Sequence, residues 1–212
     1  MQPEDTVSIL LQEQEILVLM TGLGFKHADG VFQKHDFSRN EVLRILLKLM
    51  QKGEITAYQN KIRCADDTRC VLQSMGTATR VLFLEQNGMT CCIYCGERFI
   101  LCESVDYSPE MLRLTSFSKQ KMLQWLEESM PDTGTENIPL TEEMLWNETE
   151  RELLHLCVYH NGSIDMSFRV MQWINGTREI EISWKNGEST CIPYDKENMI
   201  QQIIRAATEN LL

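Results

Sequence analysis

Residues 173–190 carry two Asn-Gly pairs that enclose a strictly alternating segment, WINGTREIEISWKNGEST. Asn175-Gly176 and Asn186-Gly187 are dipeptides that tolerate the two positive φ angles of a type I′ turn, whose twist matches that of the strands it joins. Between the two pairs, apolar and polar residues alternate with a period of two, which is typical of an antiparallel strand with one buried face. The segment therefore predicts two consecutive hairpins.

The two faces of the middle strand in this segment differ in chemistry. The apolar face, which we expect in the core, consists of Ile180, Ile182 and Trp184. The polar face, which we expect in solvent, consists of Glu179, Glu181 and Ser183. These three polar residues are the candidate partner-binding residues, because a polar sheet face without a catalytic motif is better suited to binding than to chemistry.

The same order of elements occurs earlier in the chain. Residues 79–130 read as strand, Asn-Gly turn, strand, glycine, strand and helix, and residues 164–212 read as a second unit of strand meander and helix. Ser108 before Pro109 predicts the helix start in the first unit, and Asp195 predicts it in the second. The repeat predicts an α+β fold in which a pseudo-twofold pair of meander-plus-helix units forms a central antiparallel sheet flanked by helices.

A linker and a helix are expected between the two repeated units, in residues 131–160. The segment PDTGTENIPLT is rich in turn-forming residues. Thr141 then precedes two glutamates, which predicts the start of a helix that reaches about His155. Residues 79–212 would thus make one α+β part, continuous with or separate from residues 1–78.

The N-terminal part, residues 1–78, has a winged-helix-like order. A helix is expected over about residues 6–20, a shorter one within residues 28–37, and a third begins at Ser38, where Glu41 completes a capping box. Gly53 predicts the C-cap of the third helix, and residues 54–66 predict a small hairpin. The apolar side of the third helix is expected in the core; it consists of Val42, Ile45, Leu46, Leu49 and Met50.

A winged helix leads to an alternative function, that of a transcriptional regulator whose C-terminal part is a sensor or dimerisation domain. Such a module would contact nucleic acid through residues 38–63. The basic candidates are Arg39, Arg44, Lys48, Lys52, Lys61 and Arg63. We favour an ordinary solvated surface, because residues 1–80 contain ten Lys/Arg and ten Asp/Glu and therefore lack the basic charge that binds phosphates.

Composition places the chain among cytoplasmic globular proteins. Its net charge of −11 lies entirely in residues 81–212, which should repel nucleic acid and anionic membranes. The first residues lack a basic signal-peptide region, and no later segment approaches the roughly 20 apolar residues that span a bilayer. The eight cysteines are accordingly expected to be reduced.

Two groups of residues raise the question of chemistry. Cys92 and Cys95 form a C-x-x-C pair, but no second pair supplies the four ligands of a structural zinc. His155, Cys157 and His160, with Asp165 nearby, could contain a Cys-His nucleophile, although their places at a strand end and a turn favour structural roles. No nucleotide-binding, hydrolase or metalloprotease motif occurs. We therefore expect a protein that is not an enzyme and needs no cofactor or metal.

The winged-helix-like start, the phrase LMQKGEITAY, the segment VLQSMGTATRVLFLE and the two meander-plus-helix halves resemble the EspG-type chaperones of type VII secretion. The similarity spans most of the chain and consists of element order and apolar positions. It implies a central antiparallel sheet, helical flanks and the binding of secretion substrates in the cytosol, and it assigns no individual binding residue. The leading hypothesis is a cytosolic protein-binding module, a class that includes secretion chaperones and accessory factors, with a small helical partner.

Overall fold

The computed structural model describes residues 6–25, 36–59, 61–86, 88–105, 108–132, 150–173 and 176–208. These residues form five helices, an antiparallel sheet of nine strands and a separate two-stranded hairpin. The predicted α+β class with an antiparallel sheet is confirmed.

Two compact units divide the chain in an interleaved way. The first unit contains Met1–Thr79 and Cys91–Lys119, and the second contains Arg80–Thr90 and Gln120–Leu212. Residues 91–119 therefore cluster with the N-terminal segment and not with the remainder of the predicted C-terminal part.

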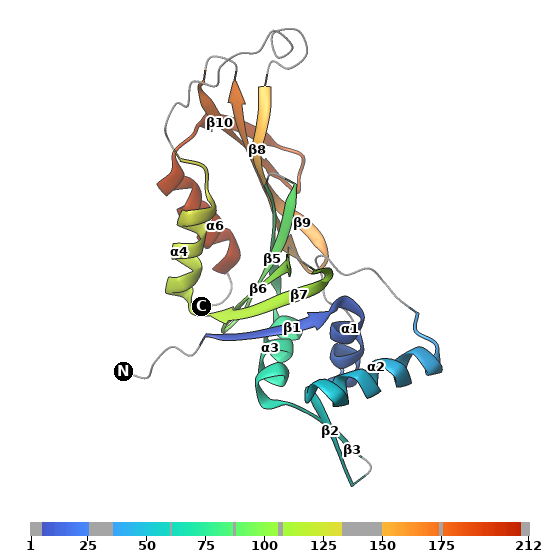
Figure 1. The fold of residues 1–212 in the computed structure, drawn as a ribbon. Coiled ribbons are helices and arrows are strands. Elements are labelled where there is room, and N and C mark those ends of the chain that lie inside the picture. Colours follow the sequence, from blue (N-terminus) through green and yellow to red (C-terminus); the bar gives the residue numbers. More distant parts are fainter. Residues whose placement is uncertain are drawn as a thin grey trace. The chain divides into compact units, whose positions relative to one another are not determined.

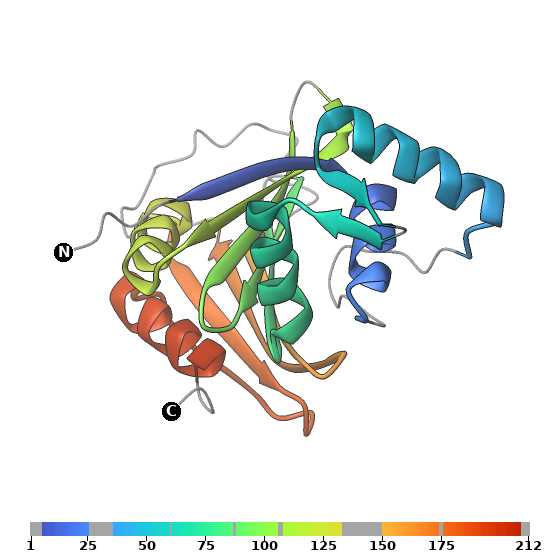
Figure 2. The ribbon, with the colours of Figure 1, turned by 90° about the horizontal axis from the view of Figure 1, so that it is seen from below.

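The sheet of the first unit has the strand order β1-β7-β6-β5. These strands are β1 (Val7–Gln12), β7 (Ser108–Phe117), β6 (Phe99–Val105) and β5 (Met89–Cys95). Helix α3 (Asp66–Thr77) packs on β1, β6 and β7 and buries Val71, Leu72 and Met75 (Figure 2). Strand β5 is buried from Cys92 to Cys95, which confirms that this predicted strand is apolar on both faces.

The remaining elements of the first unit follow the sequence signals closely. Helix α1 (Glu13–Gly22) packs on α2 (Arg39–Lys52), which leads into the hairpin of β2 (Ile55–Tyr58) and β3 (Lys61–Cys64) (Figure 1). The capping box of α2 is present, because the Ser38 amide donates to Glu41 Oε2 over 2.8 Å and the Glu41 amide donates to Ser38 Oγ over 3.3 Å. Gly53 caps the C-terminus with φ +79°. The predicted short helix within residues 28–37 lies largely outside the described residues.

The second unit is a meander with the strand order β4-β8-β9-β10-β11. Its strands are β4 (Arg80–Gln86), β8 (Glu150–His160), β9 (Ser163–Trp173), β10 (Arg178–Trp184) and β11 (Ser189–Pro193). Its helices α4 (Lys119–Ser129) and α6 (Lys196–Thr208) lie side by side in Figures 1 and 2, and α6 packs on β4 and β8. Asp195 caps α6 as predicted, since its Oδ1 accepts the Asn198 amide over 2.9 Å.

Three of the predicted helical segments form strands instead. Residues 7–12 form β1, because pairing with β7 buries Leu11 completely, and the helix begins only at Glu13. Ser108 and Pro109 begin strand β7 and not a helix; the register with β6 shifts at this end, where a proline that cannot donate to the ladder is tolerated. Residues 150–160 form β8, so the helix expected to reach His155 is wrong there, and residues 141–149 lie outside the described part.

Strand β8 forms because its alternation finds partners on both sides. Leu154, Leu156 and Val158 are buried, and β8 pairs with β4 on one edge and with β9 on the other. Residues 79–130 thus contain four strands and a helix, one strand more than predicted, because β7 replaces the start of the expected helix. Strand β8 adds a further strand ahead of the three that were predicted for the second unit.

The turn at Asn186-Gly187 differs from the predicted type, and Asn175 of the other predicted turn lies outside the described residues. Trp184 accepts a hydrogen bond from the Gly187 amide and donates one to the Glu188 carbonyl, both over 2.9 Å, and only Gly187 has a positive φ, of +84°. This is a three-residue loop with glycine in the left-handed region and not a type I′ turn. The two positive φ angles of a type I′ turn occur instead at Asn161 (+50°) and Gly162 (+77°).

Among the described residues, no helix has both the length and the apolar character needed to cross a membrane.

Candidate functional site

The predicted partner-binding residues lie together on one face of β10. Ile180 and Ile182 are buried on the opposite face, so the alternation predicted from the sequence is confirmed. The residues of the polar face are half-buried; they are Glu179, Glu181 and Ser183. Trp184 is only half-buried, which corrects its assignment to the core.

The two carboxylates of this face are bound by side chains of β9. Arg169 donates from Nε to Glu152 over 2.8 Å and from an Nη nitrogen to Glu181 over 3.3 Å. These hydrogen bonds, led by the one to Glu152, raise the pKa of Arg169. Trp173 donates from Nε1 to Glu179 over 3.0 Å. Sequence reasoning missed Arg169 and Trp173, although their odd-numbered positions on a predicted alternating strand place them on this same face.

The histidine and cysteine group of β8 brings one cysteine into contact with one histidine, Cys157 with His155. Cys157 Sγ lies 3.3 Å from His155 Nε2, whereas His160 contacts the side chain of Asn161 and Asp165 pairs with Arg80 at 3.3 Å. Burial, reinforced by the charge of Glu152, raises the pKa of the Cys157 thiol. A raised pKa leaves less of the thiol as thiolate near neutral pH, and the thiolate is the nucleophilic form.

Two of the six basic candidates on α2 and the hairpin bind a buried glutamate of α1. Lys52 Nζ lies 2.6 Å from Glu15 Oε2, and Lys48 Nζ lies 3.9 Å from Glu15 Oε1 and donates to Gln12 over 2.6 Å. Glu15 is only 1% exposed, and its Oε2 also accepts the Gln12 amide over 2.8 Å. Lys48 and Lys52 therefore hold α2 against α1.

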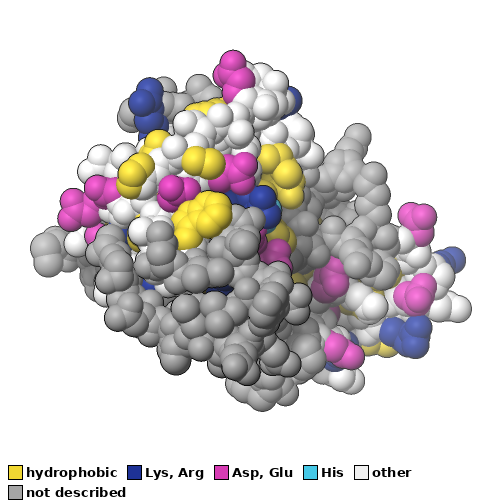
Figure 3. Space-filling view, turned by 90° about the horizontal axis from the view of Figure 1, so that it is seen from above, with side chains coloured by type: hydrophobic (Ala, Val, Ile, Leu, Met, Phe, Trp, Pro, Cys, Tyr) yellow, Lys and Arg dark blue, Asp and Glu magenta, His cyan; other side chains and the backbone are white. Residues whose placement is uncertain are grey.

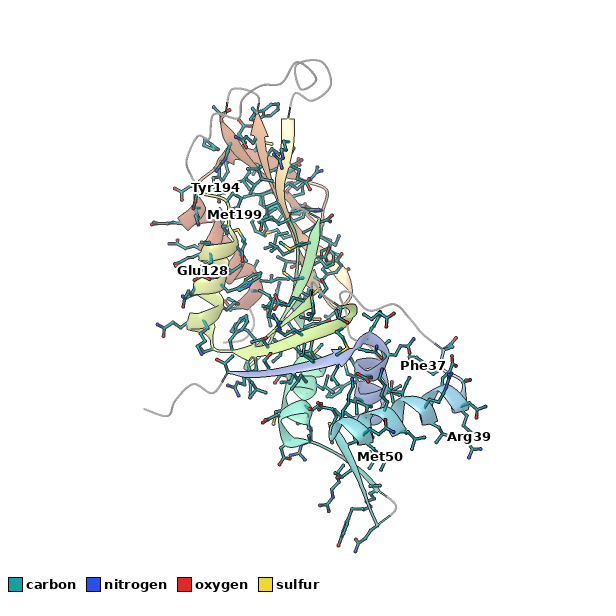
Figure 4. All side chains as sticks on the ribbon, viewed as in Figure 1. Phe37, Arg39, Met50, Glu128, Tyr194 and Met199 are labelled. Carbon is teal, nitrogen blue, oxygen red and sulfur yellow. The ribbon has the colours of Figure 1, made fainter. Side chains whose placement is uncertain are left out.

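The other four basic candidates are exposed. The Arg63 guanidinium lies over the Tyr58 ring, 5.2 Å from its centroid, within the hairpin. Within the described part of the chain, Arg39, Arg44 and Lys61 form no ion pair. Arg39 lies at the start of α2 and Met50 near its end (Figure 4).

A second apolar side of α2 faces solvent, which the sequence reasoning missed. Five of the eight exposed large hydrophobic residues in the described part of the chain lie between residues 43 and 62, with exposures from 43% to 61%. They are Leu43, Leu47 and Met50 on α2 and Tyr58 and Ile62 on the hairpin. Met50 was assigned to the core, and its exposure corrects that assignment. We call Leu43, Leu47 and Met50 the α2 stripe.

The α2 stripe is separate from the side of α2 that packs in the core. Ile45 and Leu49 are buried against the first unit, while the stripe residues follow one another at spacings of four and three. An amphipathic helix needs only one apolar side to pack on its own domain. The signal was readable in the sequence, because RNEVLRILLKLMQK has seven aliphatic or methionine side chains that one narrow core-facing side cannot all bury.

Figure 3 shows one face of the structure, on whose described part acidic, basic and hydrophobic side chains lie near one another. In the described residues, no three His, Cys, Asp or Glu side chains converge as metal ligands would. A comparison of the chain with protein-family models and with curated proteins gave no match.

Proposed function

We propose that this protein is a non-enzymatic protein-binding module and that its partner binds on the α2 stripe. The exposure of Leu43, Leu47 and Met50 carries this proposal. Contiguous apolar surface on a soluble protein is characteristic of interaction sites, because leaving it in water costs about 25 cal/mol per Å². The five exposed hydrophobic residues between residues 43 and 62 distinguish α2 and the hairpin from the rest of the described surface.

The polar face of β10 is a weaker candidate for the same role. Glu179 and Glu181 already accept hydrogen bonds from Trp173 and Arg169, so a partner would have to displace these contacts. We therefore assign the partner to the α2 stripe and keep the β10 face as a prediction.

The expected class of module is a cytosolic chaperone or accessory factor. This proposal is supported by the resemblance in element order to EspG-type secretion chaperones, which would make the partner a secretion substrate. The raised pKa of the Cys157 thiol favours a binding role over nucleophilic chemistry, because less of the thiol is present as thiolate.

The alternative, a winged-helix regulator, is less well supported by the contacts. The order α2, Gly53 and hairpin fits a wing, and Arg39, Arg44, Lys61 and Arg63 are exposed. However, Lys48 and Lys52 form ion pairs with Glu15. In addition, an exposed apolar stripe would contribute no binding energy to a contact with a phosphate backbone.

Capture of the tagged full chain from cells of its source, after mild cross-linking, tests the proposed function. We expect one protein to be captured by the natural chain and by Met89→Ser, but not by Leu47→Ser. Met89 is a matched control because it is also an exposed hydrophobic residue and lies outside α2. Hydrogen exchange on the complex should show slower exchange in residues 39–52. Equal capture by Leu47→Ser, with no protection of α2, contradicts the proposal.

A further inference from the structure

We propose that the occupant of the α2 stripe is an acidic amphipathic helix of a partner protein. This inference rests on the proposed function and adds the chemistry of the partner. It follows from the arrangement of apolar and basic side chains around the axis of α2.

The spacing of the stripe fits a helical partner. Leu43, Leu47 and Met50 span seven residues, which corresponds to about 10 Å along a helix axis. A ridge of this kind packs into the groove of a second helix whose apolar residues have the same period. Strand addition needs an exposed sheet edge, and α2 offers none because its backbone groups are bonded within the helix.

Two arginines that form no ion pair within the described part of the chain lie on the two sides of the stripe. With about 100° between successive residues, the three stripe residues fall within a sector of about 60°. Arg39 lies about 20° beyond Met50 on one side, and Arg44 lies about 60° beyond Leu47 on the other. The lysines that bind Glu15 fall farther round the helix, on the side toward α1.

The charge of the whole segment favours an acidic occupant. Residues 38–64 contain six Lys/Arg and two Asp/Glu, a net charge of +4 in a chain with a net charge of −11. Carboxylates placed beside the apolar residues of a partner helix would pair with Arg39 and Arg44. Complementary charges at the rim of an apolar contact fix its orientation and exclude wrong partners.

The same charges disfavour the other occupants. A second copy of the chain would bring the same basic rim of Arg39 and Arg44 and no matching acidic rim, so these arginines would gain no opposite charge. Nucleic acid would bind the arginines through its phosphates but would leave the α2 stripe exposed to water. An anionic membrane would repel the excess acid of the chain.

Selection from a displayed library of helical peptides tests the inference. The library randomises one helix face, the full chain is the bait, and binders that also bind Leu47→Ser are removed. We expect the selected peptides to have a net negative charge and apolar residues at spacings of three and four. For the best synthetic peptide, Leu47→Ser and Arg44→Glu should each raise the Kd at least tenfold.

Two control variants accompany the measurement. Met89→Ser removes an exposed hydrophobic residue, and Lys119→Glu reverses an exposed charge at the start of α4; both should leave the Kd within twofold. Both test residues are exposed, so thermal unfolding should be unchanged, and Arg44→Glu provides a second test if Leu47→Ser fails to fold.

Several results would overturn the inference. Neutral or basic selected peptides, or a Kd insensitive to both Leu47 and Arg44, contradict it. So does Leu47-dependent binding to duplex DNA or to phosphatidylserine vesicles, or Leu47-dependent self-association in sedimentation. If capture from cells depends on Leu47 but the selected peptides are not acidic, the inference is wrong and the protein-binding function stands.

Discussion

Glu15 is the buried charge on which the α1–α2 contact of the first unit depends. Its Oε2 accepts hydrogen bonds from Lys52 Nζ over 2.6 Å and from the Gln12 amide over 2.8 Å. A buried carboxylate is tolerated only with such partners, because its desolvation cost is otherwise large. Lys48 and Lys52 therefore lie on the side of α2 toward α1, and the α2 stripe lies on another side.

Glu15→Gln should reduce the free energy of unfolding by about 1–3 kcal/mol, since the neutral amide keeps the shape but weakens the bonds to Lys52 and Gln12. Urea unfolding followed by circular dichroism measures the change. The exposed Glu97→Gln is the control and should change stability by less than about 0.5 kcal/mol. A variant as stable as the natural chain would show that the Glu15 contacts contribute nothing net.

The thiols of the chain should react in an order set by burial. Because its pKa is raised by burial, Cys157 remains protonated through neutral pH, and its alkylation rate should rise only at a pH above that of an ordinary thiol. The exposed Cys191 should be alkylated by iodoacetamide at least tenfold faster at pH 7.5, as mass spectrometry of timed samples can show. Rapid alkylation of Cys157 at neutral pH would instead support the Cys-His nucleophile that we rejected.

In helix α3, Gly76 lies so close to the ring of Phe25 that only glycine fits at this position. A Cβ atom added to Gly76 would lie 2.4 Å from the Phe25 ring, whereas one added to Gly22 in α1 meets nothing within 4 Å. Gly76 therefore allows the segment that follows α1 to pack on α3 within the first unit.

Gly76→Ala should destabilise the protein by about 1–3 kcal/mol, because the Phe25 ring must move out of its packed position. The matched change Gly22→Ala adds the same methyl group in a helix without a clash, so it should be neutral or stabilising by up to about 1 kcal/mol. Thermal unfolding of both variants gives the comparison. Equal effects of the two substitutions would mean that the Phe25 contact has no energetic weight.

Charge is distributed unequally over the molecule. The first unit contains twelve Lys/Arg and fourteen Asp/Glu, a net charge of −2, and the second contains eight and seventeen, a net charge of −9. The positive segment around α2 is therefore local, and the sum of charges opposes the approach of polyanions.

The full chain should bind duplex DNA no more tightly than about 10⁻⁴ M near 0.15 M salt, since its unpaired cations are few and its net charge is negative. Fluorescence anisotropy with labelled genomic fragments over a salt series measures this. Binding in the micromolar range with a steep salt slope that Arg44→Glu abolishes would favour the winged-helix regulator.

Local signals predicted the elements whose ends they mark. Ser38, Glu41 and Gly53 defined α2, and Asp195 defined the start of α6, because a cap is made by residues adjacent in sequence. The predictions for the segments of β1 and β8 were wrong for a different reason. Their apolar residues suit either a helix or a strand, and the choice depends on distant strands that pair with them.

The candidate site was only partly readable in the sequence. The polar face of β10 followed from alternation alone, and the six basic candidates of α2 and the hairpin were correctly placed on or near the surface. The pairing of β9 with β10 was needed to show that Arg169 and Trp173 donate hydrogen bonds to the carboxylates of Glu181 and Glu179. The buried side of α2 was needed to show that Met50 faces solvent.

The sequence by itself determined the α+β class, the strands on either side of the Asn-Gly pairs and the capped helices, because periodicity, turn residues and caps act over a few neighbouring residues. Only the tertiary structure decided which apolar side of α2 is buried, which cations are engaged by Glu15, and that β8 is a strand. Those outcomes depend on partners far away in the chain, and side-chain burial and ion pairing are fixed only when such partners meet.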